Sequence, residues 1–246
     1  RKREEARRLL RLYSLSDPIQ EPVWRQLDVP YFLRHEPQGI AWHTRLLHYR
    51  INAEEPVVKA RLSPAGEGLQ VVIYVRDQRD LFARICGYFG SIGFNIVDAK
   101  IYTTAHGYAL DTFQVMDVGS IAHPRDMIAQ IEHELADWLA NQVPLPQPFQ
   151  GRVSRRVKHF PIAPEVHIVP DEKAQYHSLS ITAGDRPGLL YALARVLGSY
   201  DVDLHTAKIA TLGERAEDVF LVSGEALANS KTVLQLETDL LKALQA

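Results

Sequence analysis

Cysteine is almost absent from this sequence, since Cys86 is the only one in 246 residues. A disulfide framework within one chain and a zinc site built from cysteines are therefore both excluded. A single thiol fits the reducing cytoplasm, which is the location we expect. The sequence also lacks an apolar run of about 18 residues, the length that a membrane-crossing helix needs. We therefore expect no membrane partner.

An excess of charge of either sign is lacking as well, because the formal net charge is only −2. Charge alone thus gives no reason to expect binding to a polyanion. Residues 1–11 are charged where a signal peptide needs an apolar stretch. The sequence begins with Arg1 rather than Met, inside a helix-like pattern, and we expect further residues upstream of it in the natural protein.

Residues 1–62 predict a small helical unit that links to something upstream. Apolar residues recur at helical spacing in residues 1–15 and 38–48. Four aromatic side chains are expected to pack this unit: Trp24, Tyr31, Phe32 and Trp42. The arginines of the first helix are interpreted as a solvated face.

From residue 69 the pattern becomes that of an α+β fold. Residues 69–75 predict a strand, residues 79–92 a helix, and residues 95–103 and 108–116 two strands around a turn at His106 and Gly107. A second amphipathic helix is expected over residues 124–141, and a strand near Val166 is expected to close the unit.

Residues 144–164 predict a stiff linker, because they contain five prolines. They also carry basic residues, among them Arg152, Arg155 and Arg156. This basic cluster lacks interleaved aromatic residues and a recognisable nucleic-acid-binding fold, so no nucleic-acid partner is expected.

The α+β pattern occurs twice. Residues 71–103 align without gaps on residues 179–211, and nine of the 33 pairs are identical. Duplication of one module therefore decides the architecture. We expect two tandem ferredoxin-like βαββαβ units, over residues 63–170 and 171–246, with the last strand of the second unit missing. Open sheet edges would let a second chain extend the assembly into a homodimer.

One turn of the second copy has the chemistry of a ligand site. Asp185, Arg186, Pro187 and Gly188 lead into a helix that starts near Leu189. Proline suits the first helical position, and glycine lets the backbone approach a ligand closely. The amino end of the helix favours a carboxylate.

The next strand opens with Asp203 and Leu204, and the Asp203 carboxylate is expected to hold an ammonium group beside this turn. Both charged groups of a free α-amino acid, the carboxylate and the ammonium group, would thereby be recognised. The bland alternative is that Asp185 only caps the helix and that the proline and glycine only form a turn.

The first copy keeps only part of this pattern. Asp77 matches Asp185, whereas Asn95, followed by Ile96, stands where the second copy has Asp203. Its turn from Asp77 to Leu81 contains neither proline nor glycine. We therefore expect the first site to be degenerate.

These residues resemble known proteins. The turn at residues 185–190 within a βαββαβ repeat is similar to that of the ACT domain, an amino-acid-sensing module. Three sets of residues more closely resemble the bifunctional uridylyltransferase/uridylyl-removing enzymes that modify the nitrogen-regulatory PII protein. These are residues 204–220, residues 95–103 with 109–113, and residues 31–35 with 40–43.

That resemblance implies a function. Such enzymes transfer UMP from UTP to PII when glutamine is scarce, remove it when glutamine is plentiful, and sense glutamine through their ACT domains. Their nucleotidyltransferase and His-Asp metal motifs do not occur in this sequence. The chain would be the regulatory C-terminal sensor without catalytic residues or a cofactor of its own, and magnesium would belong to catalytic domains elsewhere.

The residues bear on two alternative functions. A metal-dependent enzyme is disfavoured, because His43 and His48 are five residues apart and no HExxH motif occurs. A dimerising scaffold that binds no ligand stays open as the alternative to an amino-acid sensor. His205 is interpreted as a packed or surface residue, and Lys100 and Lys208 are expected to pair with Asp111 and Asp218 across the sheet.

Overall fold

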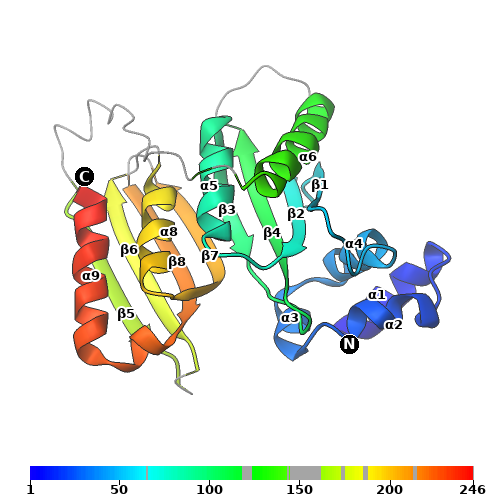
Figure 1. Cartoon of the computed structure of the whole chain (residues 1–246), viewed down its shortest axis with the longest axis horizontal. Coiled ribbons are helices and arrows are strands. Elements are labelled where there is room, and N and C mark those ends of the chain that lie inside the picture. The colour runs from blue at the N-terminus through cyan, green and yellow to red at the C-terminus, as the bar shows by residue number, and fades with distance from the viewer. Residues whose placement is uncertain are drawn as a thin grey trace.

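An eight-stranded antiparallel sheet runs through the whole molecule in the order β1-β2-β4-β3-β7-β8-β6-β5 (Figure 1). The computed structural model describes residues 1–64, 66–117, 124–142, 144, 162–172, 175–184, 188–212 and 215–245. The strands are β1 (Val57–Leu62), β2 (Leu69–Arg76), β3 (Phe94–Lys100), β4 (Tyr108–Asp117), β5 (Glu165–Pro170), β6 (His177–Gly184), β7 (Asp203–Leu212) and β8 (Arg215–Ser223). The expected α+β class is confirmed.

Both halves of the sheet have the same order of elements. Each reads strand, strand, helix, strand, strand, helix, with α5 (Leu81–Ser91) and α6 (Pro124–Ala140) in the first half and α8 (Leu189–Ser199) and α9 (Ser230–Gln245) in the second. A short 3₁₀ helix, η1 (Glu225–Ala228), precedes α9.

The strand near Val166 belongs to the other half than expected. β5 pairs with β6 of the second half, where Val166 lies opposite Ile181. The expectation that this strand closes the first copy was wrong. The expectation that the second copy misses a strand was wrong too, because β5 belongs to it. β1, which the sequence assigns to the helical unit, is the matching edge of the first half. Hairpin pairing explains both, because closing a short local loop costs less entropy than returning across the sheet.

The two halves meet where β3 pairs antiparallel with β7. Ala99 lies opposite Ala207 at this joint, and these two residues are also equivalent in the repeat. Lys208 Nζ contacts Asp98 Oδ1 at 2.6 Å across the joint.

The expected pairing of Lys100 and Lys208 with Asp111 and Asp218 was wrong. Lys100 lies opposite Thr112 and Lys208 opposite Val219. Each predicted partner is one residue away, and side chains one residue apart point to opposite faces of a sheet.

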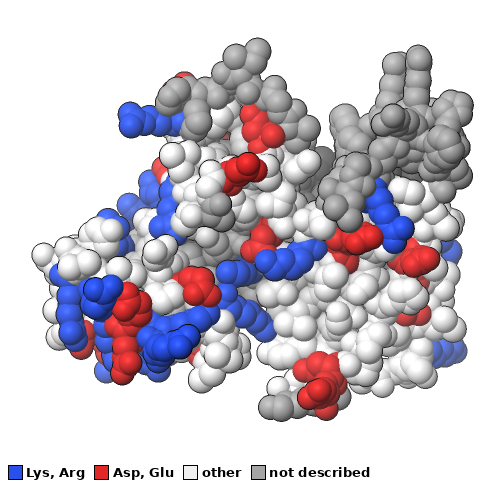
Figure 2. Space-filling model, turned by 180° about the vertical axis from the view of Figure 1, so that it is seen from behind, with Lys and Arg blue, Asp and Glu red and all other residues white. Residues whose placement is uncertain are grey.

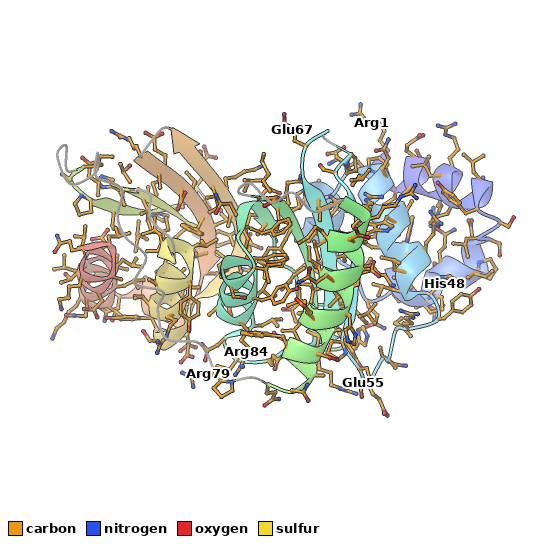
Figure 3. All side chains as sticks on the ribbon, turned by 90° about the horizontal axis from the view of Figure 1, so that it is seen from above. Arg1, His48, Glu55, Glu67, Arg79 and Arg84 are labelled. Carbon is orange, nitrogen blue, oxygen red and sulfur yellow. The ribbon has the colours of Figure 1, made fainter. Side chains whose placement is uncertain are left out.

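Helices α5, α6, α8 and α9 cover one face of the sheet, and a single hydrophobic core lies beneath them (Figures 1 and 3). This core contains residues of both halves, including Phe89 and Phe113 from the first and Leu193 and Phe220 from the second. Figure 3 shows Arg79 and Arg84 at the outer side of α5. The two halves therefore share one core.

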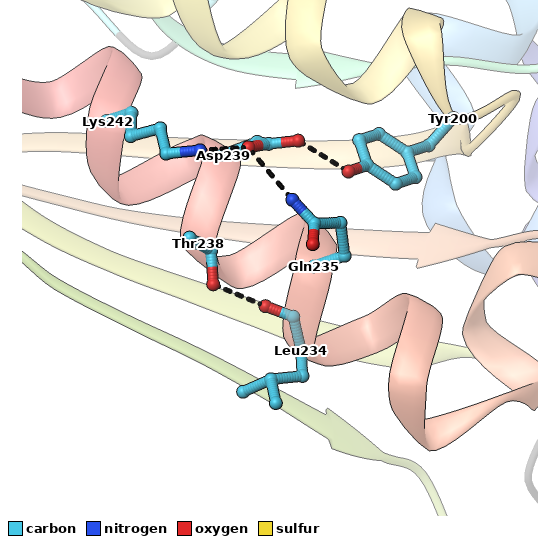
Figure 4. Close-up of polar contacts among 6 residues, drawn as sticks. All are labelled: Tyr200, Leu234, Gln235, Thr238, Asp239 and Lys242. Carbon is cyan, nitrogen blue, oxygen red and sulfur yellow. Dashed lines mark hydrogen bonds and ion pairs between the residues drawn. The ribbon is translucent and has the colours of Figure 1, made fainter.

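A hydrogen bond connects the C-terminal helix α9 to the residue that follows α8 (Figure 4). The Tyr200 hydroxyl donates to Asp239 Oδ2 at 2.6 Å, and within α9 Lys242 Nζ donates to Asp239 Oδ1 at 3.0 Å. The hydrogen bond from Tyr200 is the main reason why the pKa of Asp239 lies below its ordinary value.

Among the described residues, the other face of the sheet is covered only in the first half. A helical unit formed by α1 (Lys2–Leu12), α2 (Asp17–Trp24), α3 (Val29–Arg34) and α4 (Pro37–Leu47) packs there in a second core. Val72 and Tyr74 of β2 are buried beneath it, whereas the equivalent residues in the second half are Ser180 and Thr182. Figure 2 shows this uncovered second half as mostly uncharged surface, while Lys and Arg gather on the helical unit.

Buried hydrogen bonds fix the helical unit to the sheet. The Tyr31 hydroxyl bonds His43 Nδ1 at 2.7 Å, and His43 Nε2 in turn lies 3.2 Å from the Thr112 hydroxyl of β4. The backbone N–H of Asp28 donates to the Tyr102 hydroxyl at 3.0 Å. Helix α3 is thus held directly against the first half.

The predicted linker at residues 144–164 lies mostly outside the described residues. Within the part of the chain that the structure describes, no helix is both long enough and apolar enough to cross a membrane.

Candidate ligand site

A cavity of about 510 Å³ opens where three parts of the chain meet. The first half contributes the turn from Asp77 to Leu81 and the segment after β3. The second half contributes the end of α8 and the start of β7, and the helical unit contributes Asp28, Pro30 and Arg34. This volume is typical of pockets for small molecules.

The walls of the cavity are strongly acidic. Five aspartates line it: Asp28, Asp77, Asp80, Asp111 and Asp203. Burial raises the pKa of Asp77, and the charge of Asp203 raises it further, while hydrogen bonds from the Gln78 N–H and the Thr103 hydroxyl oppose this shift. Asp77 and Asp203 come from different halves, and both line the cavity. Such a pair favours a bound cation.

Asp111 lies at the base of the site and is fully buried, with an exposed fraction of 0%. The backbone N–H of Tyr102 donates to its Oδ1 at 3.2 Å, and its Oδ2 has no hydrogen-bond partner among the described residues. Burial raises the pKa of Asp111 to about 8. At neutral pH this carboxyl is therefore mostly protonated and can donate a hydrogen bond.

Tyr176, His205 and Arg34 also line the cavity. The rings of Tyr176 and His205 meet edge to face with centroids 4.9 Å apart, and His205 Nε2 lies 2.7 Å from the Ser223 hydroxyl. Burial lowers the pKa of His205 to about 4, and the charge of Arg34 adds to this effect. His205 is therefore neutral at pH 7, and it is both packed and part of the cavity wall.

The turn that opens the site has a left-handed residue in both copies. Asp80 has φ +58° and Gly188, its repeat equivalent, has φ +80°. Aspartate tolerates this conformation better than most residues. The lack of glycine therefore does not prevent the first copy from forming the turn. Asp80 lies close to α8, since a Cβ on Gly198 would come 2.7 Å from its Oδ1.

The predicted site residues fall into three groups. Asp77, Asp203 and Leu204 line the cavity. Asp185, Arg186 and Pro187 lie outside the described residues. The remaining four do not line it: Gly188 caps the start of α8, Leu189 is buried in the core, Asn95 is exposed and Ile96 is buried.

The structure places Asp203 beside the turn of the other copy, whereas the sequence pattern paired it with the turn of its own copy. The reason is the antiparallel joint, at which the Ile101 N–H donates to the His205 carbonyl oxygen at 2.8 Å. The start of β7 is thereby brought to the end of β3, next to Asp77. A sequence pattern within one copy carries no signal for this crossing.

Sequence reasoning also missed Asp28, Arg34 and Tyr176. They precede the sheet or lie in a connection, and no repeat partner marks them. Asp111 carried a signal, because both copies keep an aspartate at this position, Asp111 and Asp218, and both are buried. Within the described ranges, no cluster of His, Cys, Asp or Glu is arranged to hold a metal ion.

Comparison with known proteins adds a family to this geometry. Residues 1–46 match the family described as the fifth domain of uridylyltransferase GlnD. Over 99% of its length the chain is 53% identical to a bifunctional uridylyltransferase/uridylyl-removing enzyme of Aromatoleum aromaticum and 56% identical to one of Cupriavidus pinatubonensis. The chain spans 28% of each of these relatives.

A solved structure described as an unknown protein from Galdieria sulphuraria covers 76% of this chain and 91% of that chain, at 12% identity and a TM-score of 0.22. A likeness that weak carries no argument. The chain is thus homologous, nearly from end to end, to one segment of the uridylyltransferase/uridylyl-removing enzymes.

Proposed function

We propose, from its homology to one segment of the bifunctional uridylyltransferase/uridylyl-removing enzymes, that this chain is the regulatory region of such an enzyme and that its cavity binds free glutamine. Its two halves would be tandem ACT domains. The parent enzyme would add UMP to PII and remove it. The observation that carries the proposal is an acidic cavity shared by both halves and the helical unit.

The charges of the cavity suit a zwitterion with a neutral side chain. Asp77 and Asp203 offer carboxylates to an ammonium group, while one arginine also lines the wall. The protonated Asp111 carboxyl, with its unpartnered Oδ2, can donate to an amide oxygen. A second negative charge, as in glutamate, would meet several aspartates and be repelled. The site therefore favours glutamine over glutamate.

A ligand in this position can regulate the enzyme through the arrangement of the parts that enclose it. The cavity exists only when the two halves and the helical unit hold their relative positions. A ligand that binds this arrangement better than others shifts the population towards it, by as much as its affinities differ. The helical unit matches the GlnD fifth domain. A change in the position of this unit would therefore carry the effect of ligand binding to the rest of the enzyme.

Isothermal titration of the purified chain with glutamine, glutamate and asparagine tests the proposal. We expect saturable binding of glutamine, weaker binding of glutamate, and a loss of about 10-fold in affinity for Asp203→Asn, since one charged hydrogen bond is removed. The matched control is Asp201→Asn, because Asp201 is 89% exposed and does not line the cavity.

Absence of heat with every amino acid, in a chain shown to be folded, would contradict the sensor and favour a scaffold that only holds subunits together. Equal weakening by both variants would instead point to a diffuse electrostatic effect, which argues against contact between Asp203 and the ligand.

A further inference from the structure

The geometry points to Arg34, which the helical unit contributes, as the residue that binds the carboxylate of the amino acid in the cavity. This inference rests on the proposed function, and it adds a specific contact from outside the duplicated sheet. A bound amino acid would then be held by three parts of the chain at once: the first half, the second half and helix α3.

The charges in the cavity single out Arg34. Among the described residues that line the cavity, Arg34 is the only Lys or Arg, against five aspartates. A zwitterionic ligand needs a cationic partner, and arginine binds carboxylates through two parallel hydrogen bonds. No other lysine or arginine of the described residues is available on these walls.

The Arg34 guanidinium is free to take a ligand. Among the described residues, no Asp or Glu lies within ion-pair distance of Arg34, whereas three other arginines of the helical unit have such a partner: Arg8, Arg11 and Arg25. Its Cζ lies 5.5 Å from the centre of the Tyr176 ring, a cation–π contact that orients the group.

The position of helix α3 keeps Arg34 at the cavity. Asp28, at the start of that helix, also lines the cavity, and its backbone N–H donates to the Tyr102 hydroxyl at 3.0 Å. Burial lowers the pKa of His205, and the charge of Arg34 adds to this effect.

The consequence is a link between ligand and helical unit. The cation–π contact of Arg34 with Tyr176 already joins α3 to the second half. A ligand carboxylate on Arg34, with its ammonium group at Asp77 and Asp203, adds a second connection between the same parts. Occupancy of the cavity thereby adds to the contacts that hold α3 against the sheet.

Titration calorimetry on the whole chain with two probes tests this assignment. The probes are glutamine and glutaminol, in which an alcohol replaces the carboxylate. The variants are Arg34→Met, which removes the charge and keeps an apolar stem, and Arg34→Lys. The matched control is Arg50→Met, on an exposed arginine outside the cavity.

We expect wild type to bind glutaminol about 10- to 100-fold more weakly than glutamine, as for loss of a charge-assisted contact. Arg34→Met should lose the same factor for glutamine and show no further loss with glutaminol. Arg34→Lys should recover part of the affinity, and Arg50→Met should bind like wild type.

Two results would overturn the inference, and they are distinguishable. If Arg34→Met still prefers glutamine over glutaminol by the wild-type factor, another group binds the carboxylate, while the proposed function stands. If folded wild type binds neither probe, the proposed function fails together with the inference.

Discussion

Acidification from pH 7 to pH 4 is expected to remove about 3 kcal/mol of stability that the buried, neutral His35 of the helical unit contributes. Burial lowers the pKa of His35 from 6.5 to about 4, and its Nε2 has no hydrogen-bond partner among the described residues. Burial also holds the pKa of His43 well below its ordinary value.

The sign follows from proton binding. Between pH 6.5 and pH 4 the unfolded chain binds protons at these histidines and the folded chain does not. The stabilising contribution of His35 is therefore complete above pH 6.5 and falls as the pH drops towards 4. The lowering of the His35 pKa from 6.5 to about 4 corresponds to about 3 kcal/mol. His43 acts in the same direction, and Asp111 acts in the opposite direction with a comparable size, because its pKa is raised to about 8 and the folded chain binds that proton first.

Denaturant unfolding at pH 7, 5.5 and 4 measures this dependence. His35→Asn, which keeps a donor to the Tyr31 carbonyl oxygen, should lose this contribution, so that acid destabilises the variant by about 3 kcal/mol less than wild type. The control His133→Gln should follow wild type, because the His133 side chain is 80% exposed. A pH dependence of His35→Asn equal to that of wild type would contradict the burial of the His35 imidazole.

Truncation of either equivalent core phenylalanine is expected to lower the stability of the entire sheet. Phe113→Ala and Phe220→Ala should each cost about 3–5 kcal/mol, since both side chains have an exposed fraction of 0%. Both belong to the one core beneath α5, α6, α8 and α9. The two variants should therefore shift the same single transition.

Scanning calorimetry checks this expectation, with agreement of the calorimetric and van't Hoff enthalpies as the criterion for one transition. Val219→Ala is the matched control beside Phe220, because Val219 is 45% exposed. Two separate transitions, each shifted by one variant only, would mean that the halves unfold independently and that the joint between β3 and β7 is weak.

Much of the fold could be predicted from the sequence, because the repeat doubles every signal. Helices α5 and α6 and strands β2 and β4 lie close to their expected ranges. The assignment of β5 failed for a physical reason. The sequence of a short apolar strand such as Glu165–Pro170 does not indicate which neighbouring strand it pairs with. β5 pairs with β6, the nearer strand along the chain, because the shorter loop costs less entropy to close.

The covered face of the first half was only partly predictable. Consecutive side chains such as Asp111 and Thr112 of β4 point to opposite faces of the sheet, yet both are buried, because the sheet has a core on each face there. Comparison of the copies contains the missing signal. Val72 and Tyr74 are large and apolar where the second copy has Ser180 and Thr182, and this difference marks the face that the helical unit covers.

The cavity could be predicted even less completely. Asp77 and Asp203 were singled out by the repeat, but their meeting depends on the register of the β3–β7 joint. Arg34 and Tyr176 reach the site from segments far away in the chain. Contacts of that kind follow from tertiary packing and leave no periodic pattern in the sequence.

The most direct test of this account is a crystal structure of the chain grown or soaked with glutamine. We predict one glutamine in the cavity, with its ammonium group within about 3.2 Å of the Asp77 or Asp203 carboxylate and its carboxylate on the Arg34 guanidinium. Glutamine bound only at another place, with this cavity filled by water alone, would contradict the assignment of the site.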